Sequence, residues 1–180
     1  MNRSIMPRAR NEFTSVSKLS AESFGEPGQR TFRIQVDSAS SSASIWIEKE
    51  QLFQLALAIQ QMMATLTEEQ DPTGGPPNDR EAPGLTSLDF KVMKLVLGHD
   101  AGRGLFIIDA HDAEDEERAT IRVWADKQQI SGFSEEALRV CAAGRPLCPL
   151  CGRAVDPDGH RCARVNGHAK LTPEDLADPE

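Results

Sequence analysis

Two similar stretches decide the fold: IWIEKEQL at residues 45–52 and VWADKQQI at residues 123–130. Trp, Lys and one Gln coincide in the two stretches, and the acidic and branched apolar positions agree in kind. Each stretch begins with the period-two alternation of a strand and continues with the spacing of a helix. Both tryptophans of the chain lie at the matching position. The match predicts a duplicated unit of the form strand–turn–strand–helix.

The residues around the first stretch complete one such unit. Residues 31–36 alternate between apolar and polar side chains, and a Ser-rich turn separates them from a second strand at 44–48. These two strands are expected to pair as an antiparallel hairpin. Apolar residues then recur at intervals of three and four, which predicts a helix over residues 48–66.

The second unit follows the same order. Residues 89–97 are predicted to form a strand, with the start of a helix as the alternative, and the continuous apolar run at 105–108 is predicted to form a strand buried on both faces. Residues 120–125 alternate again, and a helix is expected over 126–143, ended by Gly144.

These elements predict an α+β fold. We expect one antiparallel sheet built from the two strand–strand–helix units, with both helices on one face, and then a small zinc knuckle module. The expected segments are an N-terminal arm at 1–24, a first unit at 25–66, a flexible linker at 67–87, a second unit at 88–144, a zinc-binding module at 145–170 and a disordered tail at 171–180.

Composition excludes several classes of protein. The chain has 180 residues, of which 39% are hydrophobic and 27% charged, as in ordinary globular proteins. No apolar run approaches the roughly 20 residues that cross a bilayer, and no apolar stretch follows the first arginines as a signal peptide requires. The net charge of −8 argues against a general nucleic-acid coat protein. The 4 cysteines all lie in the last quarter of the chain, which favours a reducing cytoplasm over a disulfide-rich secreted fold.

The C-terminal cysteines indicate a metal site. Cys148 and Cys151 are separated by two residues and followed by a glycine, a knuckle that directs two sulfurs at one ion. Cys162 is the expected third ligand. His160 and His168 compete for the fourth position, and the Asn-Gly turn before His168 favours that residue because it can fold the chain back.

Other interpretations of these cysteines remain open. A redox pair normally precedes a helix in a βαβ unit, whereas this pair follows one. A catalytic zinc ion needs an open position and a general base. A closed four-ligand site for structural zinc is preferred over both of these and over no metal at all. Cys141 falls on the preceding helix and is expected to be a buried apolar residue.

The turn GEPGQR at residues 25–30 is a second candidate site. Gly25, Gly28 and Arg30 can bind an anion there, although a tight turn into the next strand is the simpler interpretation. His99 and His111 are candidates for acid–base chemistry, but no nucleophile motif accompanies them, and surface loops are their simpler assignment.

Several motifs carry a resemblance to a known family. They are GEPGQRTF at 25–32, AGRP at 143–146, CPLCG at 148–152, DPDGHRC at 156–162 and NGH at 166–168. Together they resemble a family of uncharacterised bacterial proteins of similar length, a domain of unknown function. Ala163 stands where that family suggests a proline, and the linker is long, but neither difference removes a ligand. The resemblance implies a bacterial cytoplasmic protein with a C-terminal zinc-type motif, and it assigns no reaction.

The leading functional hypothesis is a non-enzymatic binding or regulatory protein that acts through a protein partner. The body is acidic, and the basic C-terminal module has no aromatic residue to stack on a base. Nucleic-acid binding is the first alternative, and the arginines that would carry it are Arg145, Arg153, Arg161 and Arg164, with Arg3, Arg8 and Arg10 of the arm. An enzyme that uses the GEPGQR turn with His99 or His111 is the second alternative, and no membrane partner is expected.

Overall fold

The computed structural model describes residues 7–26, 28–66, 75–77 and 86–142, and, further along, residues 148, 150, 151, 155, 159–162, 164, 170 and 171. The chain divides into two compact units. The first unit comprises residues 1–25 and 30–141, and the second comprises residues 26–29 and 142–180.

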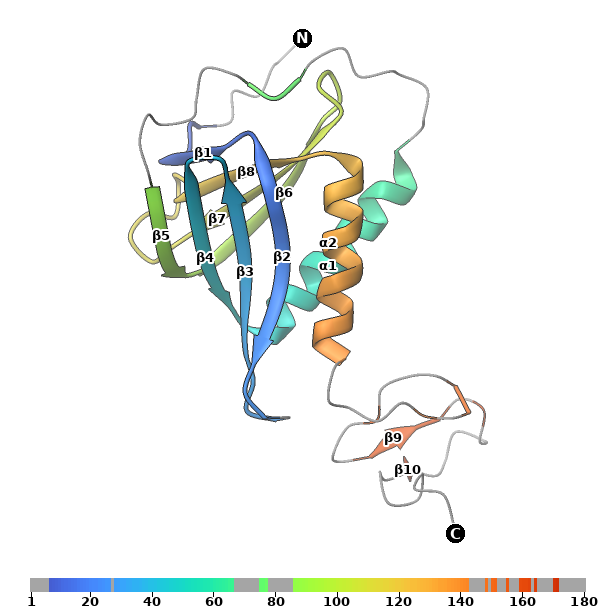
Figure 1. Ribbon diagram of the computed structural model, residues 1–180. Helices are drawn as coiled ribbons and strands as arrows, with labels where there is room; N and C mark the ends of the chain where they lie inside the picture. The colour runs from blue at the N-terminus through green and yellow to red at the C-terminus, as the bar shows by residue number, and fades with distance from the viewer. Residues whose placement is uncertain are drawn as a thin grey trace. The chain divides into compact units, whose positions relative to one another are not determined.

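The first unit contains two helices and two four-stranded sheets (Figure 1). Its strands are β1 (Asn11–Phe13), β2 (Val16–Phe24), β3 (Thr31–Ser38), β4 (Ser41–Ile47), β5 (Thr86–Lys91), β6 (Lys94–Asp100), β7 (Leu105–His111) and β8 (Ile121–Ala125). Its helices are α1 (Lys49–Thr65) and α2 (Lys127–Ala142). The first sheet has the order β2-β3-β4-β5, and the second sheet has the order β1-β8-β7-β6.

The two sheets share one layout. Each has three consecutive antiparallel strands and a fourth strand that is parallel to its neighbour. In the first sheet β5 lies parallel to β4, and in the second sheet β1 lies parallel to β8. Each half of the chain therefore gives its first strand to the sheet of the other half.

The two tryptophans occupy matching places in this layout. Trp46 of β4 donates a hydrogen bond from Nε1 to Oδ1 of Asp89 in β5, at 3.0 Å. Trp124 of β8 donates one from Nε1 to Oε2 of Glu12 in β1, at 3.3 Å. A phenylalanine follows each of these carboxylates in the sequence. In both sheets, therefore, a tryptophan of the matching stretch is hydrogen-bonded to a carboxylate of the parallel fourth strand.

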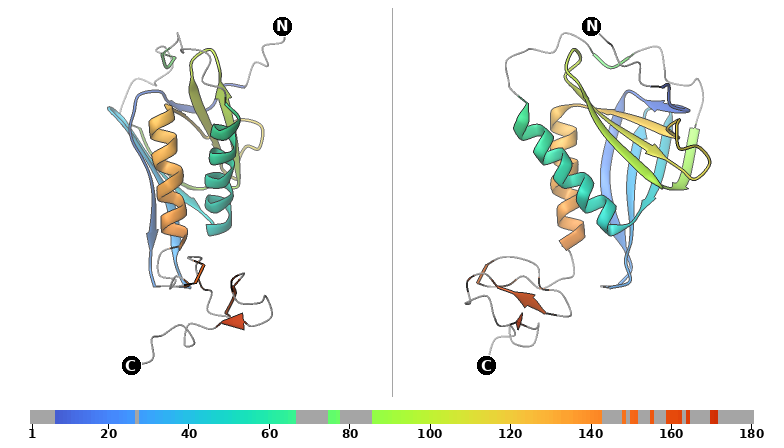
Figure 2. Two further views of the ribbon diagram at one scale, coloured as in Figure 1. Left: turned by 90° about the vertical axis from the view of Figure 1, so that its right-hand side faces the viewer. Right: turned by 180° about the vertical axis from the view of Figure 1, so that it is seen from behind.

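One hydrophobic core holds the first unit together. It contains buried side chains from both sheets and both helices, and the helices lie on the same side of the sheets (Figure 2). Phe32, Ile34 and Val36 point into this core from β3, as their alternation predicts, and α1 buries Leu52 and Ile59. Among the described residues, no helix combines the length and the apolar character that a membrane crossing requires.

The α+β class predicted from the sequence is confirmed. The hairpin β3–β4 and the two helices form where they are expected, and β7 is an interior strand with buried residues on both faces. The expectation of a single antiparallel sheet is wrong. The two predicted hairpins belong to separate sheets, and each sheet includes one parallel pair.

Two further expectations about segments are wrong. The arm predicted at 1–24 contains β1 and β2, because residues 11–24 are ordered by pairing with β8 and β3. The strand predicted at 89–97 is divided between β5 and β6. Val92 donates its N–H to the carbonyl of Trp46 in the first sheet, at 2.9 Å, and Met93 donates to the carbonyl of His111 in the second, at 2.7 Å. The chain therefore changes sheets between residues 92 and 93.

The second unit contains a short antiparallel pair, β9 (His160–Arg161) and β10 (Lys170–Leu171). Most of the linker predicted at 67–87 and most of the tail predicted at 171–180 lie outside the described residues.

Candidate metal centre

The buried core of the second unit is built largely from cysteines. Cys148, Val155 and Cys162 are each at most 1% exposed, and Cys151 packs against them. A small core of this kind has little apolar surface to bury, so hydrophobic burial contributes little to its stability. We therefore expect another interaction to hold these residues together.

Four side chains converge on one point in this core. The ligand atoms of Cys148, Cys151, His160 and Cys162 all lie within 4.8 Å of one another. Sγ of Cys148 is 3.8 Å from Sγ of Cys162, and Sγ of Cys151 is 3.1 Å from Nε2 of His160. This cluster can hold a metal ion.

Two separations in the cluster can be compared with those around a tetrahedral ion. Around zinc, with Zn–S bonds of about 2.3 Å, two sulfurs lie about 3.8 Å apart and a sulfur and a nitrogen about 3.6 Å apart. The pair Cys148–Cys162 matches the sulfur–sulfur separation. The pair Cys151–His160 is closer than a zinc ion requires, and a shift of a few tenths of an ångström in the His160 ring would open it.

The chain around His160 directs its ring to the cysteines. Gly159 has a φ of 101°, a conformation that glycine adopts at little cost, and it immediately precedes β9. In β9, His160 stands opposite Leu171 of β10. The glycine turn and the strand pair together set the direction of the imidazole.

The local electrostatics favour a thiolate at Cys148. Burial raises the pKa of its thiol, but hydrogen bonds from the backbone N–H groups of Cys151 and Leu150, and from the side chains of Cys151 and Cys162, outweigh burial and lower the pKa to about 7. A thiolate is the form of cysteine that binds metals. The site is therefore prepared for a cation before one binds.

The structure brings together four of the five residues predicted as metal ligands. His160 joins the three cysteines, whereas His168, which the sequence favours for the fourth position, lies outside the described residues. None of the cysteines forms a disulfide. Cys141 is buried on α2, as expected, and its Sγ lies 3.8 Å from the carbonyl oxygen of Lys49.

The predicted anion site at residues 25–30 is a tight turn. The N–H of Gln29 donates to the carbonyl of Glu26 at 2.9 Å, and Gly28, at the third position of this turn, has a φ of 88°. A type II turn requires a positive φ at that position. A Cβ on Gly28 would meet nothing within 4 Å, so the backbone conformation and not a close contact explains the glycine. Gly25 also has a positive φ, of 99°. Anion binding by Gly25, Gly28 and Arg30 stays a prediction.

The two histidines considered for acid–base chemistry are not in surface loops. His99 belongs to β6 and its ring packs on Phe106, with 4.8 Å between the ring centroids. His111 ends β7, is buried, and its Nδ1 lies 3.4 Å from the carbonyl oxygen of Asp115. The strand register pairs His99 with Phe106 and His111 with Lys94, at opposite ends of the β6–β7 ladder. The structure does not bring these histidines together.

Sequence reasoning missed a buried charged cluster in the second sheet. Arg122 of β8 stands between Asp109 of β7 and Glu12 of β1 in the strand register, and all three residues are buried. Two signals in the sequence were available: Asp109 follows a continuous apolar run, and Arg122 lies in an alternating strand. Each is also typical of a solvent-exposed face, so the pattern alone did not distinguish the two cases.

Comparison with known proteins identifies the family and no activity. No curated protein and no solved structure matches the chain significantly. The family model that matches covers residues 11–162, a range that includes the four clustered residues and ends before His168. Because that range is well over half of the chain, the chain belongs to the family described as "Protein of unknown function (DUF3090)".

Proposed function

We propose that this protein is a non-enzymatic binding or regulatory protein whose C-terminal unit is shaped by a structural zinc ion and which acts through a protein partner. The observation that supports the zinc ion is the convergence of Cys148, Cys151, His160 and Cys162, with all their ligand atoms within 4.8 Å. Three sulfurs and one imidazole nitrogen are ligands that favour zinc, whereas magnesium and calcium favour oxygen ligands.

A structural role suits this donor set better than a catalytic one. Structural zinc sites have four protein ligands, whereas catalytic sites keep one position for water or substrate. Four protein ligands on one ion would complete a tetrahedral set and leave no such position. Because the apolar core of the second unit is small, binding of the ion would supply much of its folding free energy.

The character of the rest of the molecule supports a protein partner in a reducing compartment. The chain has a net charge of −8, which disfavours a generic phosphate backbone as the ligand. All 4 cysteines lack disulfides, and we place the protein in the cytoplasm on that ground. Of the arginines considered for nucleic-acid contact in the C-terminal module, Arg161 and Arg164 are exposed, and Arg145 and Arg153 lie outside the described residues.

The common layout of the two sheets supports the duplication predicted from the sequence. Both halves of the chain run as one exchanged strand, three antiparallel strands and a helix. Both tryptophans bind a carboxylate on the exchanged strand. We take the two halves to be copies of one ancestral unit.

Metal analysis of the purified protein tests the zinc site. We expect one zinc per chain by elemental analysis of protein prepared under reducing conditions, and loss of that zinc in Cys162→Ser. Cys141→Ser is the matched control, because Cys141 is also buried but lies outside the cluster, and it should keep the metal. A wild-type protein without metal would overturn the proposal and direct attention to Cys148 and Cys151 as a redox pair.

A second pair of variants identifies the fourth ligand. His160→Asn should release zinc or weaken its binding by a factor of ten or more, while His168→Asn should keep it. Competition with a chromogenic chelator measures both affinities. The opposite result would show that His168 completes the site.

Binding to a generic DNA duplex tests the alternative to a protein partner. Affinity that falls steeply between low and physiological salt would indicate phosphate contacts. We expect no such binding. Tight, salt-dependent binding that is lost in Arg161→Gln and Arg164→Gln would replace the protein partner with a nucleic acid.

A further inference from the structure

The outer edge of β6 has no strand partner in the described part of the chain. β6 is the last strand of the second sheet, paired only with β7. An edge strand presents backbone N–H and C=O groups that can pair with another strand. All but one of its seven residues are partly buried, and Lys94 is exposed, whereas β7 beside it is almost entirely buried.

The other edges of the two four-stranded sheets carry features that discourage pairing, and the middle of β6 carries none of them. β1 has only three residues, and β2 contains a register shift between Val16 and Lys18. β5 alternates and places Asp89 and Lys91 near its end. β6 also has charged residues, Lys94 and Asp100, but they stand at its two ends, and between them it presents the consecutive apolar residues 95–97. Short strands, bulges and charges are the usual protection against edge-to-edge association, so β6 is the edge suited to a partner strand.

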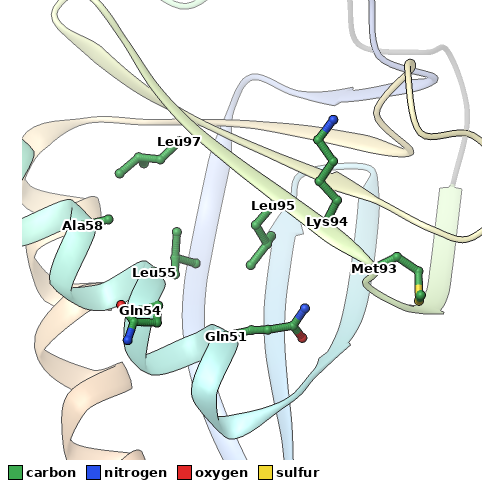
Figure 3. Close-up of a pocket in the computed structure, with 8 residues that line it drawn as sticks. All are labelled: Gln51, Gln54, Leu55, Ala58, Met93, Lys94, Leu95 and Leu97. Atoms are coloured by element: carbon green, nitrogen blue, oxygen red, sulfur yellow. The ribbon is translucent and has the colours of Figure 1, made fainter.

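A groove beside β6 adds an apolar surface to this edge. It has a volume of about 350 Å³ and lies between α1 and β6 (Figure 3). It is lined by Gln51, Gln54, Leu55 and Ala58 of α1, and by Met93, Lys94, Leu95 and Leu97 in and beside β6. Leu95 and Leu97 point toward the helix, whereas Lys94 points away from it (Figure 3). Met93, at the mouth of the groove, is 59% exposed.

The charges of β6 are complementary to those of a second β6 in the antiparallel direction. A two-fold axis at Leu97 would place Lys94 of each copy opposite Asp100 of the other, because these residues are equally distant from Leu97 in the strand. The same register brings the two Leu97 side chains together on the groove side. Opposite charges that face each other across strands stabilise the pairing, and like charges weaken it.

We propose that two copies of this chain associate through β6, as an antiparallel pair centred on Leu97 that joins their second sheets into one. The two four-stranded sheets of each copy then keep three unpaired edges in place of four. In this pair the grooves of the two copies lie on either side of the axis. Leu95 and Leu97 of both copies then form one apolar layer beside the two α1 helices. This inference is independent of the zinc site.

The oligomeric state and a charge-reversal experiment test the proposal. Sedimentation velocity of the full chain, from micromolar to several hundred micromolar, should show a dimer. Lys94→Glu places Glu opposite Asp100 at both ends of the pair, and Asp100→Lys places Lys opposite Lys94 at both ends. Each variant alone should raise the dimer dissociation constant by about tenfold or more.

The mixture of the two variants distinguishes lost pairing from lost folding. One copy of Lys94→Glu and one of Asp100→Lys restore opposite charges at both ends, so the mixture should form the heterodimer that neither variant forms alone. This matters because both residues also have contacts within their own chain. Asp100 accepts a hydrogen bond from the N–H of Arg103 at 3.1 Å and forms an ion pair with Nε of Arg103 at 3.5 Å, and Nζ of Lys94 donates to the carbonyl of Glu116 at 3.3 Å. Each variant loses its own contact, and only the restored charge pairs distinguish the mixture.

Lys91→Glu is the matched control. It makes the same change of charge on an exposed lysine of β5, in the other sheet, and it too loses a contact within the chain, the ion pair with Glu48 at 2.7 Å. It should leave the dimer unchanged. A wild-type protein that stays monomeric at several hundred micromolar would overturn the proposal. A dimer that Lys94→Glu weakens no more than Lys91→Glu does, or that the mixture fails to restore, would overturn it as well.

Discussion

At the scale of single residues, the pair Arg122–Asp109 is a buried ion pair inside the first unit. Nε and Nη2 of Arg122 donate to the two carboxylate oxygens of Asp109 at 2.7 and 2.6 Å, and the side chains are 3% and 8% exposed. The hydrogen bond with Asp109 is the largest influence on Arg122 and raises its pKa, against the lowering effect of burial. Glu12 adds a further attraction. The guanidinium therefore balances two buried carboxylates.

Breaking this pair on one side should be costly. Arg122→Met leaves Asp109 and Glu12 buried without their cation, and we expect a loss of about 3–5 kcal/mol in the free energy of unfolding. The double variant Arg122→Met with Asp109→Leu removes both charges and should recover a large part of that loss. Urea unfolding at pH 7 measures both variants. Equal destabilisation of the single and double variants would contradict this account.

The sequence predicted part of the chemistry at this scale. The spacing of Cys148 and Cys151 and the presence of Cys162 identified three ligands, because sulfur has few other roles in a polar loop. The choice between His160 and His168 depends on how the loops after Cys151 turn, and no local pattern determines that. The alternation of β8 correctly placed Arg122 and Trp124 opposite Ile121 and Val123, but it did not reveal that both faces are buried.

At the scale of elements, the helix starts were predictable because their caps are local. The backbone N–H of Gln129 donates to Oδ1 of Asp126 at 2.8 Å, and the backbone N–H of Asp126 donates to Oε1 of Gln129 at 3.0 Å. In α1, the N–H of Glu48 donates to Oε1 of Gln51 at 3.2 Å. Both contacts fall within the two matching stretches. The helices consequently begin within one residue of their predicted positions.

Removing the cap of α2 should weaken the first unit moderately. Asp126→Ala loses the acceptor for the Gln129 N–H, and we expect it to cost about 1 kcal/mol in the free energy of unfolding. Asp126→Asn keeps an acceptor at the same position and should cost only a fraction of that amount. Urea unfolding of both variants makes the comparison. If the two variants were equally stable, the cap would not contribute.

The corner between β5 and β6 was missed because the strand predicted at 89–97 did not take the phase of its alternation into account. Phe90 and Val92 lie at even positions and Leu95 and Leu97 at odd positions, so one straight strand would place the two pairs on opposite faces. The backbone partners change from Trp46 to His111 between residues 92 and 93, where this phase changes. β2 was missed for another reason: only Ser20 and Ala21 of its nine residues are buried, and its sequence is mostly polar.

At the scale of the molecule, the exchange of strands makes the two halves of the first unit interdependent. The half that ends with α1 lacks β5, and the half that begins with β5 lacks β1. The pairing partners of these strands are far apart in sequence. Local patterns carry no information about such pairing, which is why the sequence led to one sheet where the structure has two.

Cutting the chain between α1 and β5 tests this interdependence. With a protease site inserted there, the two fragments should remain associated after cleavage and, when separated in denaturant, should refold only on mixing. Each fragment alone should lack cooperative unfolding, because its three-stranded sheet misses the fourth strand, which belongs to the other fragment. Circular dichroism of the separate and mixed fragments gives the result. A fragment that folds cooperatively by itself would contradict the prediction.

The parallel pair β1–β8 also has a consequence for the way the protein is made. Asn11 leaves the ribosome early, whereas its partner Ile121 is translated only after most of the chain. At rates of synthesis of about 5–20 residues per second, β1 waits on the order of ten seconds for its place in the second sheet. Its length of three residues exposes little backbone to wrong partners during that interval. The strand that is synthesised first is thus among the last to be placed.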